Sequence, residues 1–93
     1  MSKESIMVRE YLNDRIESMK ASTKVSRAIL FDTLIKALPE YKNENQNSVR
    51  SYTLAIRKFA LKILDRWVDI KYINGYDVQG LGKKKFYRIL IDI

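Results

Sequence analysis

The stretch that decides the fold is residues 47–93, NSVRSYTLAIRKFALKILDRWVDIKYINGYDVQGLGKKKFYRILIDI. Over residues 48–66, apolar side chains recur at three- and four-residue steps, which is typical of a helix with one buried face. Over residues 68–92, the pattern becomes alternating and rich in strand formers. The stretch therefore predicts a long helix followed by a β-hairpin. The predicted core face of the helix consists of Val49, Tyr52, Ile56, Phe59, Ala60, Ile63, Leu64 and Trp67.

The long predicted helix lacks acidic residues. Between Glu44 and Asp65 there is no Asp or Glu, but there are four Lys/Arg residues. Residues 1–47 hold eight Lys/Arg and seven Asp/Glu (net +1), whereas residues 48–93 hold ten and four (net +6), which together give the formal charge of +7. A basic surplus confined to one half of the chain indicates a polyanionic partner, with nucleic acid ahead of an acidic membrane. A charged surface that serves only solubility is the plainer alternative.

The predicted hairpin has two strand-forming runs. VDIKYI (68–73) alternates as a first strand, and FYRILIDI (86–93) supplies a second. The glycine-containing segment between them leaves two arrangements open. One is a long loop over residues 74–84, and the other is a tight turn at Asn74-Gly75 followed by a third, glycine-hinged segment.

The first half of the chain predicts two shorter helices. The first spans residues 3–20, and the polar, partly β-branched residues 21–26 end it. The second spans residues 27–38, with Ser26 as its N-cap and Pro39 after its end. The predicted core faces are Val8, Tyr11, Leu12, Ile16 and Met19 in the first helix and Leu30, Phe31, Leu34 and Leu38 in the second.

Composition argues against several classes of function. The chain has no cysteine and no histidine, which excludes disulfides and removes the commonest general base and metal ligand. We therefore expect no enzyme, no metal and no cofactor, and the glycines do not match the phosphate-binding pattern GxxxxGK[ST]. No apolar run approaches the ~20 residues that span a bilayer. The N-terminal MSKESIMVREY lacks a signal-peptide core, so a soluble cytoplasmic protein is expected.

The order helix, extended piece, helix, helix, strand, loop, strand resembles the winged helix-turn-helix fold, which is mainly α with a C-terminal β-hairpin (α+β). With SVRSYTLAIRKFALKILDRWV as recognition helix and NGYDVQGLGKKKFYRI as wing, residues 1–93 look like one of the small winged-helix DNA-binding proteins of archaeal plasmids and viruses. The resemblance implies a recognition helix at 48–66 in the major groove and a wing at 68–92 on the backbone or minor groove. One departure is the connector PEYKNENQN, which is longer than the turn of a simple helix-turn-helix.

Within that group, the chain is most similar to centromere-binding proteins of plasmid partition. This resemblance implies a nucleoid- or plasmid-associated dimer that binds palindromic double-stranded DNA, spreads along it and recruits an adaptor protein. A transcriptional repressor of a plasmid or virus is the alternative, and a protein-docking winged-helix module is the alternative from another class. The predicted dimer contact lies on the first helix, at Ile6, Met7 and Tyr11.

The candidate DNA-binding residues lie on the acid-free helix and after the Gly-Leu-Gly segment. Arg50 and Ser51 are in the first turn, where a recognition helix meets base edges, whereas Arg57 and Lys58 suit phosphates. Leu54 suits contact with a thymine methyl, or alternatively with another part of the fold or a partner chain. Three adjacent lysines near a loop tip favour a phosphate backbone or a narrow minor groove, although lysine also protects edge strands. The full predicted set is Ser48, Arg50, Ser51, Thr53, Leu54, Arg57, Lys58, Lys83, Lys84 and Lys85.

Overall fold

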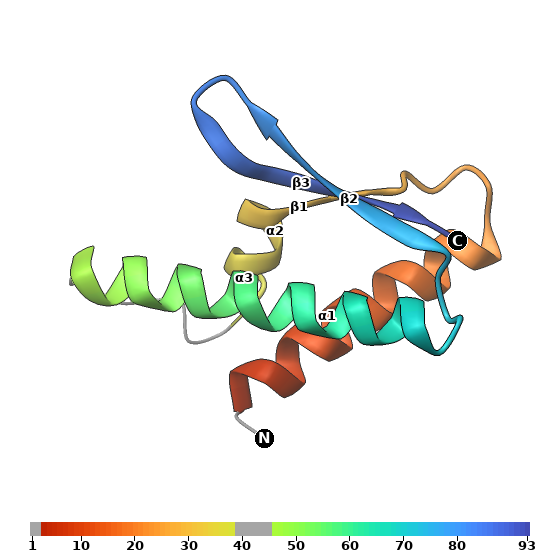
Figure 1. Ribbon diagram of the computed structural model, residues 1–93, viewed down its shortest axis with the longest axis horizontal. Coiled ribbons are helices and arrows are strands. Elements are labelled where there is room, and N and C mark those ends of the chain that lie inside the picture. Colours follow the sequence, from red (N-terminus) through yellow and green to blue (C-terminus); the bar gives the residue numbers. More distant parts are fainter. Residues whose placement is uncertain (1–2, 39–45) are drawn as a thin grey trace.

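Helices come first along the chain and a β-hairpin ends it, with one short strand inserted between the first two helices (Figure 1). The computed structural model describes residues 3–38 and 46–93, and within these it confirms the predicted α+β class. The elements are α1 (Lys3–Ala21), β1 (Ala28–Leu30), α2 (Phe31–Lys36), α3 (Gln46–Asp69), β2 (Gly75–Leu81) and β3 (Lys84–Asp92). The first and third helices match the predicted spans 3–20 and 48–66 closely, and α3 is three residues longer at its C-terminal end.

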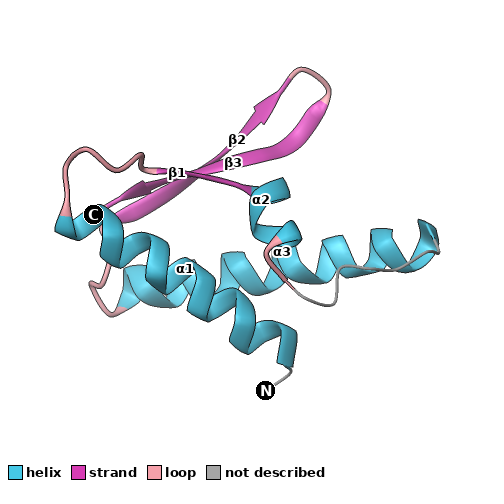
Figure 2. Ribbon diagram, turned by 180° about the vertical axis from the view of Figure 1, so that it is seen from behind, coloured by secondary structure: helices cyan, strands magenta, loops and turns pink. Residues whose placement is uncertain are grey.

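The strands form an antiparallel sheet in the order β1-β3-β2. Ile89 of the central strand β3 is opposite Ile29 of β1 on one side and Val78 of β2 on the other. In Figures 1 and 2, α2 lies between this sheet and α3, and α1 crosses α3 with its N-terminal end away from the sheet and its C-terminal end close to it. The long hairpin extends well past the helical layer, which leaves its tip without a covering element.

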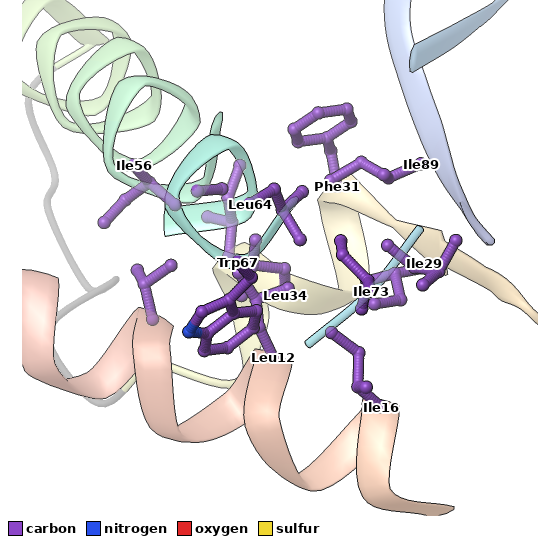
Figure 3. Packing of buried hydrophobic residues seen from close by; sticks show 14 of the residues in the cluster. Leu12, Ile16, Ile29, Phe31, Leu34, Ile56, Leu64, Trp67, Ile73 and Ile89 are labelled. Atoms are coloured by element: carbon purple, nitrogen blue, oxygen red, sulfur yellow. The ribbon is translucent and has the colours of Figure 1, made fainter. Parts of the chain in front are cut away.

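One apolar core joins all of the elements (Figure 3). Leu12 and Ile16 of α1, Leu34 of α2 and Leu64 of α3 are fully buried and point into it, together with Ile89 of β3. No helix in the described parts of the chain has the length and sustained apolar composition needed to cross a bilayer. The buried core residues are Val8, Leu12, Ile16, Met19, Ile29, Phe31, Leu34, Ile35, Leu38, Ile56, Ala60, Leu64, Trp67, Ile73, Ile89 and Ile91.

The prediction of a continuous helix over residues 27–38 is wrong, because Ala28–Leu30 form strand β1. Ser26 does not act as a helix N-cap. Its Oγ accepts a hydrogen bond from the backbone N–H of Ala28 at 3.2 Å, the local side-chain-to-backbone bond that competes with helix formation. The helix starts only at Phe31 and ends at Lys36, two residues before the predicted end. Pairing with β3 thus overrides the helical pattern of the sequence.

The predicted strand at residues 68–73 is also wrong, because α3 continues to Asp69 and then ends in a Schellman motif. Lys71 has a φ of 67°, the left-handed conformation that this motif requires. The Lys71 N–H donates to the carbonyl of Val68 at 3.1 Å, and the Tyr72 N–H donates to that of Trp67 at 2.9 Å. The Trp67 and Tyr72 rings pack edge to face, with centroids 5.1 Å apart, which supplies the apolar contact of the motif.

The hairpin is 75–92 rather than 68–92, and neither predicted turn is present. Its strands are joined by the two residues Gly82 and Lys83, because Leu81 is paired with Lys84. Gly82 has a φ of 59°, the positive value that tight hairpin turns need at their first central residue. The Asn74-Gly75 dipeptide instead leads from α3 into β2, and the Asn74 N–H donates to the carbonyl of Asp92 at 2.7 Å.

Candidate nucleic-acid interface

The hairpin and the N-terminal half of α3 project at the same end of the molecule and diverge toward their tips (Figures 1 and 2). These are the two elements that the sequence predicts to carry the basic surface. α2 lies between their bases. Their arrangement places the acid-free part of α3 and the lysine-bearing tip at one end of the fold, rather than on opposite sides.

A stack of three side chains joins α2, α3 and the hairpin. The Phe31 and Phe86 rings meet edge to face, with centroids 5.8 Å apart. The Arg57 guanidinium carbon lies 4.6 Å from the centroid of the same Phe86 ring, within the range of a cation–π interaction. Arg57 is half-buried, and its Nε is buried without a hydrogen-bond partner in the described structure. Arg57, which the sequence predicts to contact phosphate, is therefore also a packing residue, and it meets β3 close to the hairpin turn.

On α3, the outward side carries one apolar and one basic side chain from the predicted set. Leu54 is 49% exposed, so it is not a hidden core residue, and Lys58, one turn further along, is also exposed. Thr53 is half-buried. The remaining predicted residues, Ser48, Arg50 and Ser51, lie in the first two turns of α3, but their side chains fall outside the described residues.

The hairpin tip carries the lysines, as the sequence predicts. Lys83 lies in the turn itself and is exposed, and Lys85 is exposed at the start of β3. The Lys84 backbone pairs with Leu81, while its side chain is outside the described residues. Leu81 is 60% exposed at the same tip, a feature that the sequence pattern did not single out. The tip therefore combines cations with one large apolar side chain.

Two tyrosine–carboxylate hydrogen bonds fix the base of the hairpin to the helices. The Tyr76 hydroxyl at the start of β2 donates to Asp65 Oδ1 of α3 at 2.5 Å. The Tyr72 hydroxyl donates to Glu17 Oε2 of α1, also at 2.5 Å. Partial burial raises the pKa of each tyrosine to about 12, and the hydrogen bond to the carboxylate, with its negative charge, adds to the increase. Asp65, the first acid after the basic stretch, thus has a structural partner on the hairpin.

Tyr72 is the centre of a wider contact with α1. Asn13 Nδ2 donates to the Tyr72 hydroxyl at 3.0 Å. Lys20 Nζ donates to the Tyr72 carbonyl at 2.7 Å and lies 3.8 Å from the centroid of its ring. These contacts hold the turn that precedes β2, and with it the direction in which the hairpin leaves the body.

The residues predicted for a dimer contact differ in exposure. Ile6 is 41% exposed, whereas Met7 and Tyr11 are partly buried and pack against the core. Ile6 borders a shallow groove between α1 and the end of α3, which Trp67 and the 61%-exposed Ile70 also line. This groove is formed by the α1 side of the molecule, and none of its lining residues comes from the hairpin strands.

Comparison with known proteins adds no relative: no family model, no curated protein and no solved structure matches this chain. The candidate interface therefore depends on its own geometry. Phe86 and Tyr76, which join the hairpin to α3, are the contacts at this candidate interface that sequence reasoning missed. The aromatic character of the hairpin was visible in the sequence, but which helix each ring contacts depends on tertiary packing.

Proposed function

We propose that this chain binds double-stranded DNA with the face formed by α3 and the hairpin tip, which we call the basic face. Its described members are Leu54, Lys58, Lys83 and Lys85. The observation that carries the proposal is that a helical stretch without acids and a lysine-bearing tip share one end of the molecule. A carboxylate at such a contact would be desolvated beside phosphate, so its absence over twenty residues favours a polyanion.

The topology supports a winged helix-turn-helix assignment. The order of the elements, helix, short extended segment, two helices and a C-terminal hairpin, is the one on which the resemblance rests, and the pairing of β1 with β3 is a feature that the sequence did not predict. In that assignment α2 and α3 are the helix-turn-helix and β2-β3 is the wing. A helix with its side chains is about 10–12 Å wide and the major groove about 12 Å, so α3 fits with its N-terminal half inserted.

Each part of the basic face has a distinct role in this proposal. The first turns of α3 contact base edges, with Arg50 suited to guanine and Leu54 to a thymine methyl. Lys58 contacts phosphate. Arg57 joins the helix to the wing through its contact with Phe86, and in this proposal its guanidinium also binds a phosphate. The wing lysines contact the backbone or the minor groove.

We propose that the protein acts as a homodimer. A single small module buries a limited DNA interface, whereas two copies read a palindrome with half-sites about one helical turn apart. The groove beside Ile6 supports an isologous contact because its rim carries Arg9 and Glu10, adjacent residues of opposite charge that complement a second copy across a twofold axis. Sedimentation should show a dimer at micromolar concentration, and a monomer would contradict this part of the proposal.

We further propose plasmid partition as the biological role, with transcriptional repression as the alternative; the first rests on the resemblance described above. The two roles differ in how the protein occupies DNA. A footprint that lengthens outward as protein is added supports partition, with spreading and an adaptor partner. A single short protected palindrome near promoters supports a repressor.

The test of DNA binding itself is a titration of mixed-sequence duplex at several salt concentrations. The proposal predicts a steep linear fall of log affinity with log salt, because phosphate contacts release counterions. Binding no tighter or more salt-dependent than that of an unrelated basic protein would instead favour a protein-docking module.

A further inference from the structure

The hairpin tip exposes a large apolar side chain that the fold does not use. Leu81 is 60% exposed and is absent from the core and from the partly buried side chains that pack against it. Single exposed leucines are common on protein surfaces. This one differs in its position, because it stands at the end of the element that projects furthest from the helices and is followed by lysines.

The residues on either side of Leu81 have no side chains. Its two neighbours in the chain are Gly80 and Gly82, and its own side chain is 60% exposed. Glycines within a strand often mark places where another molecule approaches the backbone closely. A Cβ built on Gly82 would meet no atom within 4 Å, so its positive φ, and not close packing, is what favours glycine in the turn.

The pairing of β2 with β3 is irregular between Gln79 and Leu81, just before the tip of the hairpin. Gln79 is opposite Arg88, but the next pair is Leu81 and Lys84, so three residues of β3 (85–87) face Gly80 alone. Bulges of this kind bend and twist a strand pair and redirect its side chains. Below the irregularity, Arg88 Nε donates to Gln79 Oε1 at 2.8 Å and stiffens the ladder. The tip therefore lies beyond a bulge, and the strand pair before the bulge is held by this side-chain hydrogen bond.

We propose that Leu81 is an apolar wedge that enters the minor groove and partly unstacks a base step while the flanking lysines bind phosphates. Leucine is among the side chains that insert in this way, and each insertion bends the duplex by roughly 20–90°. The inference rests on the proposed function and adds to it, because the wing would deform the DNA as well as bind it. Flexible pyrimidine–purine steps are the expected insertion points.

The same combination of leucine and lysines also suits the surface of an anionic membrane. DNA is favoured because the acid-free part of α3 projects at the same end as the tip and matches a groove rather than a flat bilayer. Binding to vesicles of anionic lipid is therefore included as an opposing outcome of the test.

The experiment uses the full chain and a 30-bp duplex of mixed sequence with central TA steps, labelled at both ends for energy transfer. Wild type is compared with Leu81→Gln, which removes the apolar wedge at similar size, and Leu81→Met, which retains it. Because Leu81 is exposed, both variants keep the core intact. Affinity, its salt slope and the end-to-end distance are measured for each, and vesicle binding is measured by sedimentation.

We expect wild type and Leu81→Met to shorten the end-to-end distance by a bend within about 20–90°, and Leu81→Gln to bind with the same salt slope without bending. Duplex binding with an equal bend in Leu81→Gln, or with no bend in wild type, overturns the wedge and leaves the proposed function standing. Wild type that fails to bind duplex, with or without binding to vesicles, overturns both.

Discussion

The guanidinium carbon of Arg57 lies 4.6 Å from the centroid of the Phe86 ring, so the middle of α3 and the hairpin are in direct contact. Phe86 also meets Phe31 edge to face, which adds α2 to the same joint. Side-chain packing near the proposed DNA surface therefore holds α3, α2 and the hairpin together.

The Arg57–Phe86 contact should appear as a coupling energy. In a double-mutant cycle with Arg57→Ala and Phe86→Leu, we expect the two changes in free energy of unfolding to be non-additive by about 0.5–1 kcal/mol, the range for a partly exposed cation–π pair. Leucine keeps apolar bulk at position 86 and removes only the aromatic face. Urea unfolding of the four proteins measures the coupling, and strict additivity would show that the contact is energetically neutral.

Removing the wing lysines should weaken the salt dependence of duplex binding. With Lys83, Lys84 and Lys85 all changed to Ala, the slope of log affinity against log salt should flatten by roughly two to three, about one for each phosphate that is no longer neutralised. Lys24→Ala with Arg27→Ala is the control, which removes two charges instead of three from residues that are exposed on the loop before β1. Equal flattening per charge removed in the control would mean that the slope reports net charge rather than the hairpin tip.

Stability should fall in alkaline solution because of Tyr72 and Tyr76. Their pKa is raised from 10.0 to about 12 in the folded protein, so the folded state holds these protons more tightly than the unfolded chain. The resulting stabilisation is complete below pH 10 and is lost as the pH rises toward 12. The double variant Tyr72→Phe, Tyr76→Phe should lose less stability than wild type between pH 9 and 11 in urea unfolding. If the free energy of unfolding falls equally with pH in the variant and in wild type, the two tyrosine–carboxylate hydrogen bonds are contradicted.

Lys71→Gly should stabilise the protein, since Lys71 has a φ of 67° at the end of α3. Glycine adopts this conformation without the Cβ clash, and we expect a gain of about 1 kcal/mol, offset in part by the greater freedom of glycine in the unfolded chain. For a domain of this size the melting temperature should increase by about 4–8 °C per kcal/mol. Lys71→Ala separates the effects: it removes the charge but keeps the clash, so an equal gain there would point to charge.

The long helices were predictable because each repeats its apolar positions over several turns. Four of the five predicted core residues of α1 are buried, including Leu12 and Ile16, and the α3 stripe reaches Trp67 as expected. Three-residue β1 was not predictable, because its strand state comes from pairing with β3, far along the chain. Local pattern decides structure only where the pattern is long.

The ends of the hairpin were misplaced for two different physical reasons. The end of α3 could not be predicted because the residue in the left-handed conformation after the helix is Lys71, whereas glycine is the usual signal. The turn was hidden because Asn74-Gly75 is a stronger local turn signal than Gly82-Lys83, the pair that forms it. The lysine-bearing tip was still predicted at the right place in the chain. The contact of Arg57 with Phe86, by contrast, requires knowledge of how the helix and hairpin pack.

The most direct test of the basic face is the reactivity of individual lysines toward an acylating reagent, with and without mixed-sequence duplex, read by mass spectrometry. We expect duplex to protect Lys58, Lys83 and Lys85, which lie on α3 and the hairpin tip, while the exposed Lys24 and Lys71 react as before. Protection of Lys24 and Lys71 with continued reaction at the other three would place DNA on another surface and rule out the basic face.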